Sequence, residues 1–173
     1  MTWKTHAVIG ANALWITALV GKIDATVFIY LPIAIVASLL PDIDAVQAKI
    51  HYLGHGLLHS FQGLFKGKYF HHRGFMHSLF ATILFGGVIA IFSKGTELYL
   101  LPLIFMAAYF SHSIIDGFNT SVGYLYPVFM KRFALIPKSL QTPVGGAADN
   151  LLFFVGAFGI VLFFYLFQNS FTF

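Results

Sequence analysis

The chain has 173 residues, of which 58% are hydrophobic and only 9% are charged. Soluble domains carry roughly 25% charged residues. The composition therefore indicates a membrane protein and argues against a disordered chain, a basic nucleic-acid-coating domain or an ordinary cytosolic enzyme. Cysteine is absent, which excludes disulfides, thiolate metal sites and catalytic thiols. The length suits a single domain over residues 1–173.

Five apolar runs predict the helices. They cover residues 5–20, 25–40, 74–92, 98–115 and 151–167. The last three approach the roughly 20 apolar residues that cross a bilayer. The first is interrupted by His6 and Asn12, and the second is short and contains Pro32. We expect an all-α integral membrane protein with about five transmembrane or re-entrant helices.

Two segments between these runs do not resemble spans. Residues 44–73 mix basic side chains with Leu, Phe and Tyr, which is typical of an amphipathic segment at the membrane interface. Residues 117–150 are rich in Pro and Gly and predict an irregular connection.

Parity predicts that the polar clusters meet at one membrane face. If each run crosses, or if the first two form a re-entrant pair, one side receives His6, Asp42, Asp44, His72, His77, His112, Asp116 and Asp149. The same side carries 8 of the 10 Lys and Arg residues. By the positive-inside rule this side, with the N-terminus, is cytoplasmic. We expect a multi-pass protein of a bacterial or archaeal cytoplasmic membrane.

His112 and Asp116 are four residues apart in a run that predicts a helix. They therefore share one helical face and offer an imidazole and a carboxylate to a divalent metal. The alternative is a hydrogen-bonded pair that closes the helix end.

The residues around Gly74 open the third run. We expect His72 to precede the helix, Gly74 to permit a turn back towards it, and His77 to lie in its first turn. Arg73 has a planar guanidinium that suits a phosphate or a carboxylate. The alternative is a basic cluster that reaches the headgroups.

Pro41 predicts that the second helix stops near Leu40. Asp42 and Asp44 are then expected in an extended segment, on opposite sides. One would bind metal, and the other would orient a ligand or act as a general base. The alternative is a solvated turn.

The other histidines are less specific. His6 is a lone His, which is either an interfacial side chain or a further ligand delivered to the same face. His51, His55 and His59 stripe one helical face. They form either a polar stripe or a second metal site or lid.

Several elements thus deliver His or Asp to one interface. Ligands of this kind without Cys suit zinc, manganese or iron. The candidates suffice for two metal ions about 3.5–4 Å apart, which is the usual arrangement for phosphoester hydrolysis.

These motifs resemble the YdjM-like family, described as LexA-regulated, inner-membrane, metal-dependent hydrolases. The resemblance covers nearly the whole chain and rests on Thr5-His6, Leu40-Pro41-Asp42-Ile43-Asp44, His72-Arg73-Gly74 with His77-Ser78, and His112-Ser113 with Asp116. The family's ligand pattern is in turn similar to that of zinc-dependent phospholipase C.

The resemblance implies a helical site for one to three metal ions, zinc first. Carried over, it makes metal ligands of Asp42, His72, His112 and Asp116, with His6 and His77 next. Asp149 stands nearest the acidic residue that begins the family's last helix.

We therefore expect a membrane-bound metal-dependent hydrolase of a phosphoester in a lipid or amphipathic substrate. Asp44 would act as a base or orient a ligand, and Arg73 would stabilise negative charge. No nucleic-acid partner is expected. The alternatives are a non-catalytic membrane protein that moves or senses metal, and a structural metal site.

Overall fold

The computed structural model describes residues 1–21, 25–44, 73–96 and 98–170. Within these residues the chain is all-α, as predicted, and its one β-pairing is an isolated bridge between Val122 and Phe133. Five α-helices are described: α1 (Trp3–Gly21), α2 (Leu31–Leu39), α5 (Leu79–Ser93), α6 (Leu101–Gly117) and α7 (Ala147–Ser170). Short 3-10 helices are η1 (Ala25–Tyr30), η2 (Leu40–Asp44), η3 (Phe75–His77) and η4 (Lys138–Leu140).

Helix α7 is the one described helix that is both long and apolar enough to cross a bilayer, over Ala147–Leu166. Helices α5 and α6 and the segment Val27–Ile43 are also apolar but shorter. The expected number of about five spans therefore stays a prediction. The expected interfacial segment lies almost entirely outside the described residues.

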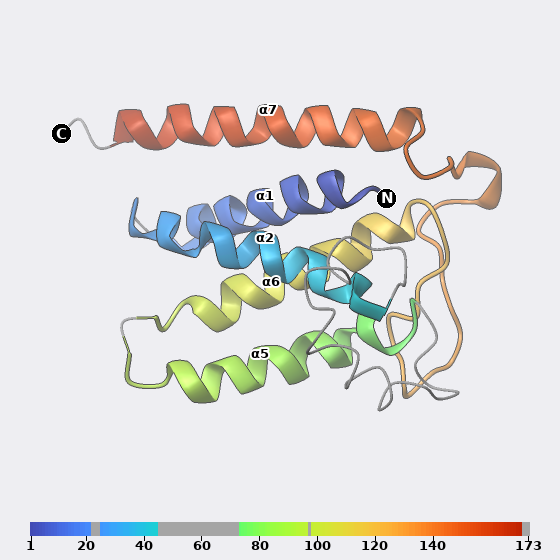
Figure 1. Cartoon of the computed structure of the whole chain (residues 1–173), viewed down its shortest axis with the longest axis horizontal. Coiled ribbons are helices and arrows are strands. Elements are labelled where there is room, and N and C mark those ends of the chain that lie inside the picture. The colour runs from blue at the N-terminus through green and yellow to red at the C-terminus, as the bar shows by residue number, and fades with distance from the viewer. Residues whose placement is uncertain (22–24, 45–72, 97, 171–173) are drawn as a thin grey trace.

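The helices form a layered bundle around α1 and α6 (Figure 1). Helix α1 packs against α2, α6 and α7, and α6 packs against α1, α2 and α5. Helices α7 and α5 are the two outer layers, on opposite sides of the bundle (Figure 1). The buried core lies between α1, α2, α5 and α6, and its largest side chains include Trp15, Ile104 and Tyr109.

Small residues allow the helices to approach closely. A Cβ atom at Gly10 of α1 would lie 2.3 Å from Cβ of Ser38, and one at Gly156 of α7 would lie 2.6 Å from Cγ1 of Val8. Asn12 joins the same two helices, because its side-chain amide donates to the carbonyl of Gly156 at 2.9 Å. Helix α7 is thus held on the bundle by its contact with α1.

Five chain segments meet at one end of the bundle, which we call the polar end. It receives the start of α1, the end of α2 with η2, η3 before α5, the end of α6 and the start of α7 (Figure 1). This is the grouping that parity predicted for antiparallel neighbours. Each segment therefore brings its His or Asp towards the same place.

Candidate metal centre

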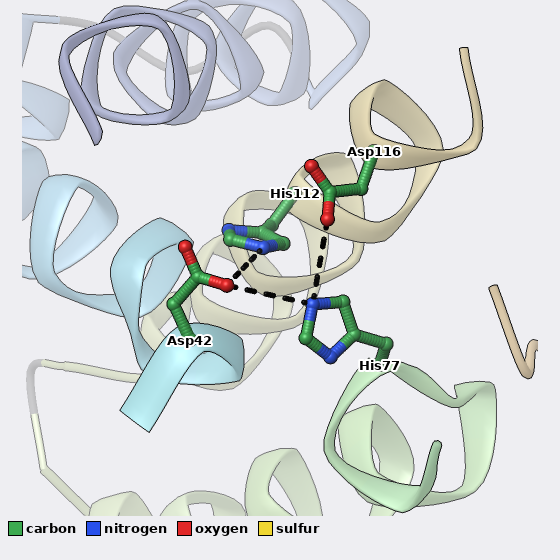
Figure 2. A group of neighbouring side chains, drawn as sticks. All are labelled: Asp42, His77, His112 and Asp116. Carbon is green, nitrogen blue, oxygen red and sulfur yellow. Dashed lines mark ion pairs between the residues drawn. The ribbon is translucent and has the colours of Figure 1, made fainter. Parts of the chain in front are cut away.

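Four side chains from three segments converge at the polar end. Asp42, His77, His112 and Asp116 each offer one nitrogen or oxygen atom, and these atoms all lie within 4.8 Å of one another. Figure 2 shows them facing a common centre, with Asp42 from η2, His77 from η3, and the other two from α6. We call these four residues the ligand cluster.

The distances in the ligand cluster suit a shared ion. Asp42 Oδ1 lies 3.4 Å from His112 Nε2 and 3.7 Å from His77 Nε2, and Asp116 Oδ2 lies 3.8 Å from His77 Nε2. Ligands about 2.1 Å from a tetrahedral zinc ion are separated by about 3.4 Å. His77, His112 and Asp116 are buried, and Asp42 is half-buried. The donor set therefore fits a divalent metal with one side accessible.

A backbone contact orients His112. Its Nδ1 atom lies 2.6 Å from the carbonyl oxygen of Ser38, so Nδ1 carries the proton and donates it. Nε2, the nitrogen that faces Asp42, is then the atom that can offer a lone pair to a metal. Metal-binding His residues usually donate their second nitrogen to an acceptor in this way. Ser38 was not expected at the site, because a backbone acceptor leaves no pattern in the sequence.

The carboxylate of Asp116 is surrounded by cationic and imidazole groups. Oδ1 accepts from the amino group of Met1 at 2.8 Å and lies 3.3 Å from Nε2 of His6. Oδ2 accepts from Nε of Arg73 at 2.9 Å. Asp116 lies at the end of α6, where the helix dipole disfavours a negative charge. Positive charge around it, from side chains or from a metal, offsets that cost.

His6 lies beside the ligand cluster and not within it. Its ring stacks on that of His112 with centroids 3.7 Å apart. Its two ring nitrogens are buried. Nε2 faces Asp116 at 3.3 Å, and Nδ1 has no hydrogen-bond partner among the described residues. A buried polar atom without a partner is costly. A metal near Asp116 could therefore use an imidazole lone pair of His6.

Arg73 adopts a conformation that the sequence did not predict. Its φ is 64°, so the left-handed residue of this turn is Arg73 and not Gly74. The backbone of Arg73 is held because its carbonyl accepts from the N–H of Gly123 at 2.9 Å. Its side chain, 26% exposed, meets the carboxylate of Asp116. Of the two partners expected for the guanidinium, the described residues therefore supply a carboxylate.

His77 and Asp42 both lie in 3-10 turns, which corrects two expectations. His77 precedes α5, because the hydroxyl of Ser78 caps that helix by accepting from the N–H of Ala81 at 3.1 Å. Asp42 is not in an extended segment. Leu40 keeps helical angles despite Pro41, and the chain tightens into η2 because Pro41 has no N–H to continue the α-helical pattern.

Asp149 is separate from the ligand cluster. Its carboxylate accepts from the N–H groups of Thr2 and Gly145, each at 2.8 Å, and from the hydroxyls of Thr2 and Thr5. It therefore joins the start of α1 to the start of α7. This role was not predicted, since Thr2 and Thr5 carry no motif of their own.

Tyr124 closes the polar end behind α6. Its hydroxyl donates to the carbonyl of Ser113 at 3.0 Å. Burial, together with the negative charge of Asp116, raises the pKa of Tyr124 to about 12. The phenol therefore stays protonated and keeps this hydrogen bond at neutral pH.

Several predicted residues lie outside the described part of the chain. They are His72, His51, His55 and His59, together with the side chain of Asp44. Their predicted roles as ligand, lid and base therefore stay predictions. His72 immediately precedes Arg73 in the sequence.

Comparison with known proteins supplies a family and no close relative. No curated protein and no solved structure matches the chain. The family model described as YdjM inner membrane protein matches residues 1–171. The chain therefore belongs to the YdjM inner membrane protein family.

Proposed function

We propose that the chain is a metal-dependent hydrolase that cleaves a phosphoester in a lipid or another amphipathic substrate at the cytoplasmic face of the membrane. The single observation that carries the proposal is the convergence of Asp42, His77, His112 and Asp116 on one partly accessible centre. Two imidazoles and two carboxylates together suit zinc, manganese or iron.

The donor atoms of the ligand cluster support a divalent ion. Because Nδ1 of His112 donates to Ser38, Nε2 is the nitrogen that can offer a lone pair, and Asp42 and Asp116 add carboxylate oxygens. His6, beside Asp116, and His72, next to Arg73 in the sequence, are further donors for a second or third ion. Zinc is our first candidate.

A divalent ion in such a site supplies a Lewis acid and lowers the pKa of water to about 7. The protein side chains would position the substrate, stabilise charge and accept a proton. Asp42, half-buried, borders the side from which a substrate reaches the centre. The partly exposed guanidinium of Arg73 would hold the negative charge that develops on a phosphoryl oxygen. Asp44 is our candidate for the base.

The place of the site favours an amphipathic substrate. The ligand cluster lies at the end of a bundle whose outer helix is apolar and exposed over most of its length. A soluble substrate would reach this end from water, whereas a lipid would present its headgroup there without leaving the bilayer. The excess of Lys and Arg that the topology expected from the sequence assigns to this side supports the cytoplasmic orientation.

The test compares two buried aspartates. Wild type, Asp116→Asn and Asp149→Asn are purified in detergent, and their metal content is measured by elemental analysis. Each is then assayed against a phospholipid, a lipid phosphate and a soluble phosphomonoester. We expect wild type and Asp149→Asn to bind metal and turn over a lipid substrate, and Asp116→Asn to lose both.

Two results would contradict the proposal. One is unchanged metal content and turnover in Asp116→Asn. The other is wild-type protein that holds metal stoichiometrically yet hydrolyses none of the three substrates, which would favour the alternative of a non-catalytic metal-binding, transport or structural protein.

A further inference from the structure

The chain between Val122 and Phe133 forms a closed loop at the polar end. Each of these two residues donates its N–H to the carbonyl of the other, and both distances are 2.9 Å. The base of the loop is also held to α5, because the N–H of Leu79 donates to the carbonyl of Tyr124 at 2.9 Å. Residues 123–132, which we call the 123–132 loop, are therefore attached to the bundle beside the start of α5.

The 123–132 loop exposes several large apolar side chains. Val128 is 75% exposed and Phe129 is 59% exposed. The large exposed apolar side chains of the loop are Leu125, Val128, Phe129 and Met130. Burying one such side chain fully is worth roughly 1.5–3 kcal/mol. The tip of the loop thus favours an apolar environment over water.

Positive charge adjoins this apolar tip. Lys131 and Arg132 follow Met130 directly, and both are exposed. Residues 117–148 contain three basic side chains and no acidic one. Each Lys or Arg near an anionic leaflet is worth about 1 kcal/mol, and the stems of these side chains can lie along apolar surface while the charge stays in the headgroups. A lipid surface with negative headgroups matches both features.

The position of the loop beside the start of α5 is consistent with contact with a lipid surface. Leu79 and Phe80, in the first turn of α5, are exposed and apolar, and Leu79 is hydrogen-bonded to the base of the loop. Exposed apolar residues, Phe80 on α5 and Leu125 in the loop, therefore directly follow the two hydrogen-bonded residues in the sequence. Irregular backbone exposed to lipid does not enter the hydrocarbon region, so the loop belongs at the depth of the headgroups.

We propose that the 123–132 loop inserts its apolar tip into the headgroup region of a leaflet rich in anionic phospholipid and sets the depth of the polar end. The occupant of this surface is anionic phospholipid. The proposal goes beyond the hydrolase proposal and does not depend on it, since the loop would anchor the polar end whether or not the ligand cluster is catalytic.

The absence of Cys in the chain permits a direct test with a single label. Phe129→Cys carries a bimane fluorophore in vesicles of phosphatidylcholine and phosphatidylglycerol, and Phe158→Cys on the exposed face of α7 is the membrane control. We expect headgroup-level nitroxide lipids to quench the label at position 129, and iodide to quench it several-fold less than it quenches free bimane–cysteine. Full quenching by iodide with none by nitroxide lipids would overturn the proposal.

A second comparison tests the charge. In phosphatidylcholine alone, lipid quenching at position 129 should fall, and Lys131→Gln/Arg132→Gln in the labelled protein should remove the difference between the two vesicle types. Equal quenching in both vesicle types before that substitution would contradict the role of anionic lipid. Protection from both quenchers, with cross-linking between labelled copies, would identify a second copy of the chain as the occupant instead. Retained metal content, or unchanged thermal unfolding if no metal binds, shows that the variants fold.

Discussion

Helices α6 and α7 are both apolar and both carry a buried aspartate, yet their surroundings differ. Helix α6 packs against α1, α2 and α5, whereas α7 packs against α1 and is exposed over most of its length. Asp116 at the end of α6 belongs to the ligand cluster, and Asp149 in the first turn of α7 does not. In this bundle, the aspartate on the helix with more packed neighbours is the one that lies in the ligand cluster.

Helix polarity explains the partners of the two aspartates. Asp149 lies at the start of its helix, where backbone N–H groups and the helix dipole stabilise a carboxylate, and it accepts N–H and O–H donors. Asp116 lies at the end of its helix, where the dipole opposes its charge. It is paired with Arg73 and with the amino group of Met1. The helix dipole therefore favours positive charge beside Asp116 more than beside Asp149, whose predicted role as a metal ligand stays a prediction.

The largest expected effect separates these aspartates. Asp116→Ala should abolish metal binding and destabilise the protein by about 3–5 kcal/mol, because it leaves buried positive charge uncompensated. Asp149→Ala should cost about 1–3 kcal/mol through its orphaned donors and should keep the metal. Elemental analysis and thermal unfolding in detergent measure both. Metal loss of the same extent in both variants would show that the contrast is wrong.

Metal removal should give the next largest loss of stability, and this loss should depend on Asp116 of α6. A ligand at 100 times its Kd stabilises the folded state by about 2.7 kcal/mol. A chelator should therefore lower the unfolding temperature of wild type and of Asp149→Asn, and adding zinc back should restore it. Asp116→Asn is the control, and a chelator should leave it unchanged. An equal shift in Asp116→Asn would place the metal elsewhere.

The smallest effect tests the attachment of α7. Gly156→Ala should destabilise the α1–α7 contact by about 1–3 kcal/mol, the usual cost of overpacking, because its Cβ would lie 2.6 Å from Cγ1 of Val8. Gly87→Ala on α5 meets nothing within 4 Å and should be neutral or stabilising by up to about 1 kcal/mol. Thermal unfolding compares the two variants, and metal content should stay at the wild-type level in both. A larger loss of stability in Gly87→Ala would reverse this assignment.

Spacing and parity predicted much of the candidate site. His112 and Asp116 share a helical face because they are four residues apart, and the structure places both in the ligand cluster. Alternating directions of successive helices predicted that Asp42 and His77 would arrive at the same end, and both lie in the ligand cluster. These inferences succeeded because they depend on helix period and chain direction, which apolar patterning specifies.

Local turns were harder to predict. Pro41 indicated the end of α2 correctly, but η2 follows it in place of an extended segment. Gly74 suggested the flexible position, yet Arg73 takes the left-handed conformation. Hydrogen bonds from segments distant in sequence, such as that from Gly123 to Arg73, decide such turns and outweigh local preference.

By itself, the sequence determined the membrane class, the helical architecture and the end of the bundle at which polar residues gather, because each follows from composition or from periodicity along the chain. The tertiary structure alone decided which of the polar residues at this end contact one another. It placed Asp149 with Thr2 and Thr5, and it aligned His112 through the carbonyl of Ser38. Differences of a few ångströms between packed helices separate a ligand from a neighbour, and only the packing of side chains sets distances on that scale.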